Sequence, residues 1–599
     1  MREQKVWQSL RMAELDSQPK SIQSIYSWYS ESKLFVNRRY QRKLVWTQVE
    51  KQKLIESVLK RYPVPAVLLA ERETGDYEVI DGLQRLHTLV SFIENSFPAI
   101  DGKFFDVSQF PTARSRADEG AFEIVSGPDE SKLTPKEVST FLDYSLAVSV
   151  MRGATEAEID DVFSRINTYG HRLSDQERRQ AGVQGEFSNL VRELSCELRG
   201  DASSDILPLA NMPAISIDLP KTKHGYSVVA DEVFWVNQGI LRSTDLRDSM
   251  DEQCIADIAA SIVGGQIVDR SKETLDDIYQ SDSVESKRIS TALDIYGEDR
   301  FKIEFKHCVD ELLKVCDSGE PKKLRSVLFK KKTTNPFPSA FAVLMIALHE
   351  ALISGQRKIA SYDGVKTALT DLSDRIETSR KSTTPEQRRK NVDTIKGLID
   401  SHLVPGNPLN YGGSHSSTDI DSIIRRSEIE LPHYELKQGI LRLDDAGTID
   451  ENVFSKVVNT ICAIANNGRG RSGTILIGVS DNGVDATRVA KLYELSPRKV
   501  SARYVVGVSR EARKLGESTE SYFARWKGAV RNSGLTDPLR ESVLSAMDFN
   551  DYFGLGVIAI TVPEQQQLSF VNGKVFAREG DETVEVTEPQ AIVRLAGRF

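Results

Sequence analysis

The stretch Tyr77-Glu-Val-Ile-Asp-Gly-Leu-Gln-Arg-Leu-His-Thr-Leu89 indicates a short β-strand that passes directly into an α-helix. Residues that favour a strand come first, at Tyr77, Val79 and Ile80. Apolar residues then recur at helical spacing, at Leu83, Leu86, Val90 and Ile93. A glycine between strand and helix lets backbone amides approach a ligand closely, and a helix N-terminus favours anions. The turn at Asp81-Gly82 is therefore a candidate anion site.

An acid, an amide and an arginine gather at this turn, at Asp81, Gln84 and Arg85. Together these groups can bind the metal ion, the base and the phosphates of a nucleotide. The simpler interpretation is that Asp81 caps the helix and that Arg85 is a solvated side chain. For an isolated motif the simpler interpretation is the more common one, because short motifs give many false positives.

Segments on either side favour the functional interpretation. Gln41-Arg42 and Trp46 lie upstream, and Arg165 and Asn167 lie downstream within residues 162–175. This ordered set resembles the N-terminal domain of GmrSD-type, modification-dependent restriction proteins, of the ParB/sulfiredoxin-like superfamily. The family pattern is Gln-Arg near a Trp, then Ile/Val-Asp-Gly-Gln-Gln-Arg, then Phe-x-x-x-Asn.

The resemblance covers about the first third of the chain and implies a site for a nucleoside triphosphate. The residues that it assigns to nucleotide binding are Gln41, Arg42, Asp81, Gly82, Gln84, Arg85, Arg165 and Asn167. Leu83 departs from the pattern, because the family has the first glutamine of the central motif there. The departure bears on nucleotide hydrolysis rather than on nucleotide binding.

Composition indicates a multidomain protein of ordinary globular type. At 599 residues the chain is too long for one core, and 40% hydrophobic with 28% charged residues is typical of a soluble protein. The net charge, 78 − 87 = −9, argues against a protein that coats nucleic acid non-specifically, but it allows local basic patches. Five scattered cysteines without a C-x-x-C pair fit a reducing cytosol, and no apolar run is long enough to span a membrane. We therefore expect a cytoplasmic protein without a membrane partner.

Four regions follow from the pattern along the chain. We expect an α/β multidomain fold, with a ParB/sulfiredoxin-like α/β domain at 1–190, a helical coupling region at 191–403, a linker at 404–420 and an α+β domain at 421–599. The linker is rich in Pro, Gly, Ser and Asn. The helical region holds two basic clusters that can attract phosphate backbones or can simply be solvated surface. Their residues are Lys322, Lys323, Arg325, Lys330, Lys331 and Lys332, and Arg380, Lys381, Arg388, Arg389 and Lys390.

The last region predicts a helix at 454–466, a glycine-rich turn at 467–473, an apolar strand at 474–479 and another strand at 556–562. Asn572-Gly573 is the strongest short hairpin signal. The set resembles the Schlafen AlbA-like domain, whose pattern is Glu-x4-Glu-Phe-Lys, a helix ending Ala-Asn, a Gly-rich turn, a strand ending Gly-Val-x-Asp, and Arg-x-Gly-x-x-Thr. The matching residues are Glu430, Glu435, Lys437, Ala465, Asn466, Gly473, Gly478, Val479, Asp481, Arg578, Gly580 and Thr583.

In nuclease members of that family, two glutamates and the aspartate after the strand form a three-carboxylate site. The resemblance implies that Glu430, Glu435 and Asp481 bind Mg²⁺ or Mn²⁺, which activates water and neutralises phosphodiester charge. Lys437, two residues after Glu435, shares its strand face and can stabilise charge in the transition state. The simpler interpretation is a binding module without metal, in which the glutamates are solvated and Asp481 is a turn residue.

Three functions are consistent with these motifs. The first is an anti-phage, restriction-like protein with a nucleotide-dependent sensor domain and a metal-dependent nuclease domain, acting on DNA more readily than on RNA. The second is a nucleotide-switched, non-catalytic DNA-binding regulator. The third places NTPase and nickase activity in the N-terminal domain. The chain could also act as a homodimer.

Overall fold

The computed structural model describes most of the chain. The described residues are 14–38, 44, 46–118, 122–169, 174–180, 185–200, 206–212, 214–216, 227–330, 333–377, 384–406, 415–427, 431–444, 446–469 and 471–599. They fall into two compact units: the first is drawn from residues 1–301, 323–346 and 373–392, and the second from 302–322, 347–372 and 393–599. Helices and several sheets occur along the chain, which confirms the predicted multidomain α/β class.

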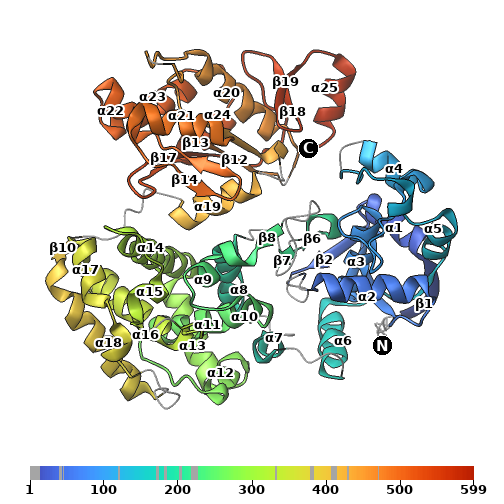
Figure 1. The fold of residues 1–599 in the computed structure, drawn as a ribbon, viewed down its shortest axis with the longest axis horizontal. Helices are drawn as coiled ribbons and strands as arrows, with labels where there is room; N and C mark the ends of the chain where they lie inside the picture. Colours follow the sequence, from blue (N-terminus) through green and yellow to red (C-terminus); the bar gives the residue numbers. More distant parts are fainter. Residues whose placement is uncertain are drawn as a thin grey trace, which may run out of the picture. The chain divides into compact units, whose positions relative to one another are not determined.

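A six-stranded mixed sheet organises the N-terminal region (Figure 1). Its strands are β1 (Glu14–Ser21), β2 (Leu34–Asn37), β3 (Val67–Glu71), β4 (Tyr77–Asp81), β5 (Ser145–Arg152) and β6 (Ile206–Pro208), in the order β1-β5-β3-β4-β2-β6. β3 pairs in parallel with β5, and β2 in parallel with β4, whereas the other neighbours are antiparallel. The predicted strand at 77–81 is therefore an inner strand of this sheet.

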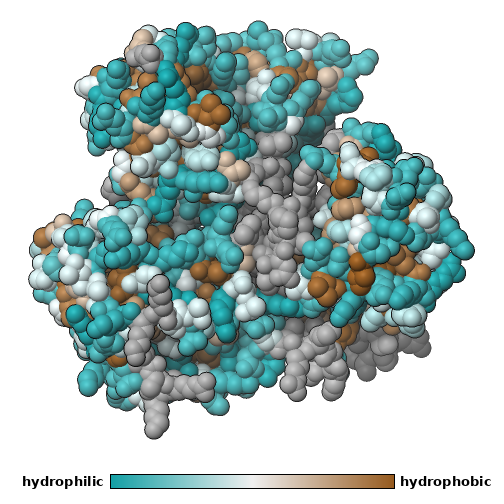
Figure 2. Space-filling model, in the orientation of Figure 1, coloured by the Kyte–Doolittle hydropathy of each residue, from teal (hydrophilic) through white to brown (hydrophobic). Residues whose placement is uncertain are grey.

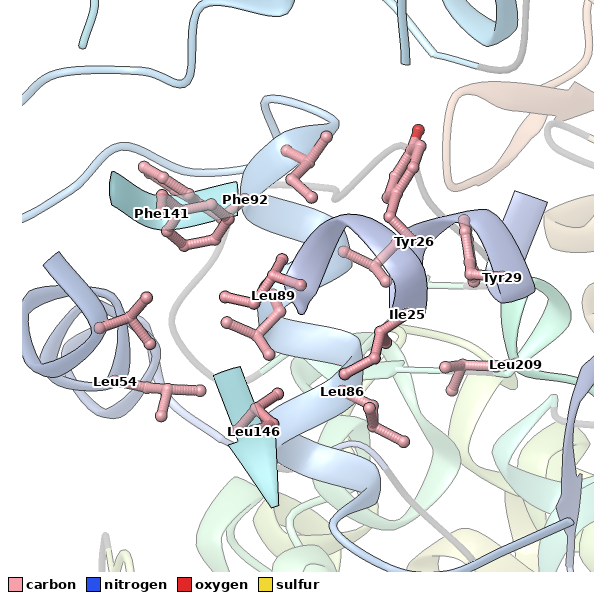
Figure 3. Close-up of a cluster of buried hydrophobic side chains, with 14 of the residues drawn as sticks. Ile25, Tyr26, Tyr29, Leu54, Leu86, Leu89, Phe92, Phe141, Leu146 and Leu209 are labelled. Atoms are coloured by element: carbon pink, nitrogen blue, oxygen red, sulfur yellow. The ribbon is translucent and has the colours of Figure 1, made fainter. Parts of the chain in front are cut away.

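Helices cover both faces of this sheet. They are α1 (Ile22–Ser30), α2 (Gln48–Leu59), α3 (Leu83–Ile93), α4 (Pro111–Asp118), α5 (Pro135–Leu142) and α6 (Glu156–Tyr169). The larger core joins α1, α2, α3 and α5 to one face, and Figure 3 shows Leu86, Leu89 and Phe92 of α3 at its centre. On the other face, Ile80 of β4 packs with Phe163 of α6. Alternate residues of β4 therefore face the two cores, which fixes the direction in which its last residue, Asp81, projects.

The middle of the chain is mainly helical, as predicted (Figure 1). Its helices are α7 (Asp175–Gln180), α8 (Glu186–Arg199), α9 (Phe234–Asn237), α10 (Ser243–Arg247), α11 (Met250–Val263), α12 (Lys272–Tyr279), α13 (Val284–Tyr296), α14 (Glu298–Asp317), α15 (Leu324–Leu328), α16 (Pro338–His349), α17 (Tyr362–Leu369) and α18 (Pro385–Ile399). Short strands are β7 (Ala214–Ser216), β8 (Ser227–Val229), β9 (Arg357–Ile359) and β10 (Leu403–Pro405). Among the described helices, none has the length and apolar character that crossing a membrane requires.

Two members of the predicted basic clusters have structural roles. Arg325 donates to the carbonyl oxygens of Gly239, Thr333 and Asn335. The buried Arg388 forms an ion pair of 2.7 Å with the equally buried Asp257. Placing Arg388 in a solvent-facing cluster was therefore wrong, because its guanidinium group is buried in an ion pair. Arg325 is partly exposed, so its part in phosphate binding stays a prediction. Lys331, Lys332, Arg380 and Lys381 lie outside the described residues.

The C-terminal module contains three small sheets. Its elements are α19 (Ser417–Arg426), β11 (Tyr434–Lys437), α20 (Asn452–Ala465), β12 (Gly473–Ile477), β13 (Val479–Ser480), α21 (Gly483–Tyr493), β14 (Arg498–Val500), β15 (Arg503–Val505), α22 (Ser509–Leu515), α23 (Thr519–Arg531), α24 (Leu539–Ser545), β16 (Met547–Asn550), β17 (Val557–Val562), β18 (Val575–Glu579), β19 (Glu582–Val586) and α25 (Pro589–Ala596). The sheets have the orders β11-β12-β17-β16, β13-β15-β14 and β18-β19. β11 and β12 run parallel, and the other pairs are antiparallel.

Helices sandwich the four-stranded sheet of this module. Ile475 and Ile477 of β12 point into a core formed with α20 and α23. Leu476, between them in sequence, points to the other face and packs with Ile420 and Ile424 of α19. Because β12 is buried on both faces, it is a rigid support for the residues that follow it.

The hairpin prediction at Asn572-Gly573 was correct for the turn and wrong for the strands. Both residues have positive φ, and Val571 and Lys574 form an isolated bridge across them. The strand pair β18–β19 instead turns at Gly580 and Asp581, where Glu579 pairs with Glu582. The Asn-Gly pair determines the turn at 572–573. The pairing of the longer strands β18 and β19 depends instead on the core against which they pack.

The predicted linker of 404–420 includes described residues at both ends. Its first two residues belong to β10, and α19 begins at Ser417. Within the second unit, α19 contacts α14: the Lys306 ammonium lies 3.3 Å from the Asp419 carboxylate, and the Ser417 N–H donates to Asp310 at 2.9 Å. The start of the C-terminal module is therefore anchored to a helix of the middle region, and the separation of two folding units at 404–420 stays a prediction.

Candidate functional site

The turn after β4 pairs its acid with its arginine. Asp81 Oδ1 accepts the Gly82 N–H at 2.7 Å, and Asp81 Oδ2 accepts a bond of 3.0 Å from Arg85 Nη2. Gly82 has φ of +100°, and a Cβ there would lie 2.9 Å from the Val67 side chain. Only glycine suits both the backbone angle and the space, so this residue lets β4 turn into α3 without a linker.

Arg85 is not the solvated side chain of the simpler interpretation. It is only 15% exposed, also donates to the Ala66 carbonyl at 2.9 Å, and has a buried Nε without a hydrogen-bond partner. Gln84 Oε1 accepts the backbone N–H of Trp46 at 3.3 Å, which joins the central motif to the predicted upstream tryptophan. The start of α3 therefore holds the arginine in a fixed position at the helix N-terminus.

The remaining residues predicted for nucleotide binding are described only in part. Arg165 lies on α6, is well exposed, and donates through Nε to both oxygens of Asp161 at 2.9 Å. Gln41, Arg42 and the side chain of Asn167 lie outside the described residues. Within the described part, Asp81, Gly82, Gln84 and Arg85 are brought together at one turn.

In the C-terminal module, Glu435 lies between two cations. Its Oε1 accepts from Lys437 Nζ, as expected for residues two apart on a strand, and its Oε2 accepts from Arg578 Nη1 at 2.8 Å. Arg578 comes from β18, and its side chain is only 1% exposed. It also donates to Thr583 Oγ1 at 3.0 Å and to the Tyr434 carbonyl at 3.3 Å. The late Arg-x-Gly-x-x-Thr motif therefore reaches the strand that carries Glu435.

Asp481 follows β13 and faces the same cluster. Its carboxylate accepts a 2.9 Å bond from Arg503 Nη1, which also reaches the Asp481 carbonyl at 3.1 Å. Partial removal of water raises the pKa of Asp481; nearby Arg503 and Lys437 act to lower that pKa, and Glu435 and Asp581 act to raise it. Asp481 is thus influenced by the charges of Glu435 and Lys437, while its printed hydrogen bond is with Arg503.

A glycine junction sets the position of Asp481. Gly478 separates β12 from β13 with φ of +110°, donates to the Lys437 carbonyl at 2.7 Å, and accepts N–H bonds from Val506 and Gly507. A Cβ on Gly507 would lie 2.1 Å from the Leu555 carbonyl oxygen. The predicted single strand over 474–479 is broken here because three chain segments meet too closely for side chains. The break redirects the chain so that β13 pairs with β15, and Asp481, directly after β13, contacts Arg503.

The described carboxylates do not fit a divalent cation as they stand. Both oxygens of Glu435 already bind cations, and Asp481 is paired with Arg503. In the part of the chain that the structure describes, no group of three or more His, Cys, Asp or Glu side chains is arranged to hold a metal. Glu430, the third predicted ligand, lies outside that part, so metal binding by Glu430, Glu435 and Asp481 stays a prediction.

Several functional candidates were not found from the sequence. Arg503 and Asp581 contact or influence Asp481, and Thr460 Oγ1 lies 3.0 Å from Thr583 Oγ1. The available signal for Arg503 was the interleaving of cations with an aromatic residue in Arg498-Lys-Val-Ser-Ala-Arg-Tyr504, a pattern typical of nucleic-acid-binding surfaces. Asn466, a predicted motif residue, instead bonds the backbone of Ser569 and Phe576 and holds the fold.

Comparison with known families identifies one part of the chain. Residues 24–183 match the family described as GmrSD restriction endonuclease, N-terminal domain, and this segment is such a domain. The match includes the six residues from Asp81 to Leu86 and most of the sheet with its helices. Neither the curated proteins nor the solved structures give a match to the chain. The resemblances of residues 421–599 to the Schlafen AlbA-like domain, and of the first domain to the ParB/sulfiredoxin superfamily, stay predictions.

Proposed function

We propose that this chain is a restriction-type, anti-phage nuclease that cleaves phosphodiester bonds at its C-terminal cluster. The N-terminal match to a restriction endonuclease domain supports the restriction role. The observation that carries the catalytic assignment is that β11, with Glu435 and Lys437, is bonded to the junction that leads to Asp481, and that the charges of Glu435 and Lys437 influence this aspartate, while Arg578 and Arg503 pair with the two acids. Clustered acids and cations of this kind suit a reaction in which a proton moves while phosphate charge increases.

Each residue of the cluster has a role in the proposal. Lys437 and Arg503 are partly exposed, so their positive charges can reach the oxygens of a bound phosphodiester. Asp481 is half-exposed and carries a raised pKa, which suits a carboxylate that accepts a proton from water. Arg578 is buried and holds Glu435 in place. Mg²⁺ or Mn²⁺ binding with Glu430 belongs to the proposal as a separate, testable part.

The N-terminal domain supplies the sensor in this proposal. We assign nucleoside triphosphate binding to the turn at Asp81, Gly82, Gln84 and Arg85, where a phosphate can bind the helix N-terminus beside the arginine that Asp81 holds in place. Gln41, Arg42, Arg165 and Asn167 complete the proposed site. Nucleic acid, DNA more readily than RNA, is the proposed macromolecular partner.

Phage plating tests the defence role. Cells that make the wild-type chain should reduce the plating efficiency of susceptible phages, whereas cells making Asp481→Asn should lose most of that protection. Glu564→Gln is the control, since this exposed glutamate lies in the same module outside the cluster. Equal protection by wild type and Asp481→Asn, at equal protein levels, would remove the C-terminal site from the defence function.

A second candidate function is a nucleotide-switched DNA-binding regulator without catalysis. The pairing of both described carboxylates with cations favours it, because ion-paired acids are poor bases and metal ligands. The two functions differ in a direct way. A nuclease variant such as Asp481→Asn keeps nucleic-acid binding and loses protection, whereas a regulator loses protection only when binding is lost. A third arrangement, with NTPase and nickase activity in the N-terminal domain, would leave Asp481→Asn active.

A further inference from the structure

A small pocket in the helical middle region is lined by two arginines and by the start of a helix. It encloses about 270 Å³, part of it open to solvent, and its enclosed end has room for about one water-sized group. The lining comes from three segments of the first compact unit: the loop between α11 and α12, the helix α16, and residues 377–391. The lining residues that bear on its chemistry are Arg270, Ser339, Ala340, Glu377, Arg388 and Asn391.

Both arginines pair with one buried carboxylate, that of Asp257 on α11. Arg270 Nε lies 3.2 Å from Asp257 Oδ2, and Arg388 Nη1 lies 2.7 Å from Asp257 Oδ1. Arg388 Nη1 also donates to the Val268 carbonyl at 2.6 Å. Two guanidinium groups therefore share one carboxylate, so these three side chains together carry an excess of one positive charge inside the fold.

Arg388 has a donor that the fold does not use. Its Nη2 is buried and has no hydrogen-bond partner in the part of the chain that the structure describes, and its side chain is only 2% exposed. A buried, charged donor without a partner is costly, and an anion oxygen is the acceptor that suits it best. Arg270, which is 12% exposed and also bonds Ser339 Oγ, is the cation nearer to solvent.

The helix α16 begins at this pocket. Ser339 and Ala340, which follow Pro338 in its first turn, both line the pocket. The N–H groups in the first turn of a helix have no partner within the helix, and the helix N-terminus favours negative charge. This turn contains no acidic residue. The start of a twelve-residue helix therefore adds to the positive potential of the two arginines.

Glu377 is the acid among the lining residues. It is exposed, and its backbone N–H and carbonyl are bonded to the side-chain amide of Asn391 at 3.1 and 2.9 Å. Water and salt screen an exposed carboxylate, whereas the charge of Arg388 is buried. The enclosed end of the pocket therefore favours an anion. The face drawn in Figure 2 is largely hydrophilic, which is consistent with a small polar ligand.

We propose that this pocket binds a phosphate group, either free or as the terminal group of a nucleotide, between Arg270, Arg388 and the first turn of α16. One phosphate oxygen occupies the enclosed end, and the others lie toward Arg270. Arginine suits this ligand because its planar fork matches the oxygens of a phosphate. The inference does not depend on the proposed function. Because the pocket joins three segments of the middle region, bound phosphate stabilises their contact.

Hydrogen–deuterium exchange of the full chain with inorganic phosphate tests the location. Compared with chloride at equal ionic strength, phosphate should slow exchange in peptides that cover Ser339 and Ala340 and in those that cover 268–270. Calorimetric titration with phosphate measures the affinity. Arg270→Gln should weaken binding at this site by about tenfold or more, because it removes a charged donor. Ala340→Leu should abolish binding there while keeping both arginines, because its side chain fills the pocket.

Two controls separate this site from others. Arg85→Ala removes the phosphate site proposed at the turn after β4 and should leave the protection of Ser339 and Ala340 unchanged. Arg242→Gln is the matched arginine variant, since Arg242 is 59% exposed and pairs with Asp245 elsewhere in the middle region. Thermal unfolding without phosphate establishes that each variant is folded.

The outcomes decide both the site and the form of its ligand. Tighter binding of a nucleoside 5′-monophosphate than of phosphate assigns the terminal group of a nucleotide, and the reverse assigns the free ion. Equal protection by chloride and phosphate would overturn the phosphate assignment. Unchanged protection in both Arg270→Gln and Ala340→Leu, or protection that disappears in Arg85→Ala, would overturn the site.

Discussion

Glu435 and Asp481 carry the same charge, but their surroundings give that charge different consequences. Glu435 compensates Arg578, whose side chain is almost fully buried. Asp481 is 56% exposed and compensates an arginine that solvent can also reach. Removing a partner from a buried ion pair leaves an uncompensated charge, whereas an exposed pair contributes little to stability.

Neutral substitutions should therefore separate folding from function at these two residues. Glu435→Gln should lower the free energy of unfolding by about 1–3 kcal/mol, because buried Arg578 loses its carboxylate. Asp481→Asn should change it by no more than about 0.5 kcal/mol. Urea denaturation of both variants is the measurement. A larger loss of unfolding free energy for Asp481→Asn than for Glu435→Gln would contradict the argument from burial. If the expected order is found, Asp481→Asn is the better variant for testing catalysis, because it leaves the fold intact.

The turn after β4 allows a similar test of nucleotide binding. Asp81→Ala and Arg85→Ala should each weaken binding about tenfold or more, because they remove the acid and the fixed cation at the helix N-terminus. Calorimetric titration with ATP, GTP and CTP measures this. Arg85→Lys checks the fold, and Arg114→Ala is the control, since Arg114 forms an exposed ion pair within α4. Unchanged binding in both alanine variants would remove the site assignment.

At the scale of single residues, the sequence predicted contacts between side chains that are close together in the chain. Asp81, Gly82 and Arg85 lie within one turn, and Lys437 follows Glu435 by two positions, so their proximity follows from strand and helix geometry. Arg503 was missed because its contact with Asp481 depends on the pairing of β13 with β15. Arg388 was misassigned for a related reason, since burial against Asp257 depends on helix packing.

At the scale of elements, the contact between α14 and α19 contains a carboxyl group in an unusual state. Asp310 is buried, accepts the Ser417 N–H through Oδ2, and has a buried Oδ1 without a hydrogen-bond partner. Burial raises its pKa from 3.8 to about 7, and the nearby Asp419 and Glu311 add to the rise while Lys314 opposes it. The folded chain therefore binds this proton at a pH where the unfolded chain has released it.

The stability of this contact should fall as pH rises. Because the folded pKa lies above the unfolded one, the penalty for burying the ionised carboxylate develops between about pH 4 and pH 7 and is complete above pH 7. Each unit of pKa shift corresponds to about 1.4 kcal/mol. Asp310→Asn keeps an acceptor for Ser417 and removes the charge, so it should be the more stable protein at pH 8 and lose that advantage near pH 4.

Urea denaturation of both proteins across this pH range is the measurement. Lys53→Gln, a change on helix α2 of the other compact unit, is a control for the pH dependence of the rest of the chain. A difference between wild type and Asp310→Asn that does not vary with pH would show that Asp310 does not titrate in this range. If wild type instead gains stability relative to Asp310→Asn at high pH, folding does not raise the pKa of Asp310.

Sequence periodicity predicted which elements exist better than where they end. β4 and α3 were correct almost to the residue, and α20 and β17 differ from their predictions by only one or two positions. β3 begins only at Val67, because Pro63 and Pro65 lie just before it and cannot donate to a ladder. The break at Gly478 was not predictable, since it depends on the close approach of Gly507 and Leu555.

At the scale of the whole molecule, the C-terminal module and α14 belong to one compact unit. Asp419 and Arg498 of the module form ion pairs with Lys306 and Asp317 of α14. We expect limited proteolysis to cut within 404–420 and to release a C-terminal fragment of roughly 180 residues, the size of an ordinary domain. The two pieces should stay together in gel filtration because α14 continues to hold α19. Cuts scattered through 191–403, or pieces that separate without denaturant, would contradict this.

The account as a whole depends on phosphodiester cleavage by the C-terminal cluster. The most direct measurement is the cleavage of plasmid DNA and of RNA by the purified chain, with Mg²⁺ or Mn²⁺ and with and without a nucleoside triphosphate. We predict cleavage that Asp481→Asn slows by orders of magnitude, while Glu564→Gln cleaves like wild type. Loss of this cleavage in EDTA would support the separate proposal of a metal bound with Glu430. Cleavage of both substrates by Asp481→Asn at the wild-type rate, or no cleavage by wild type under any of these conditions, would contradict the nuclease assignment and favour the regulator.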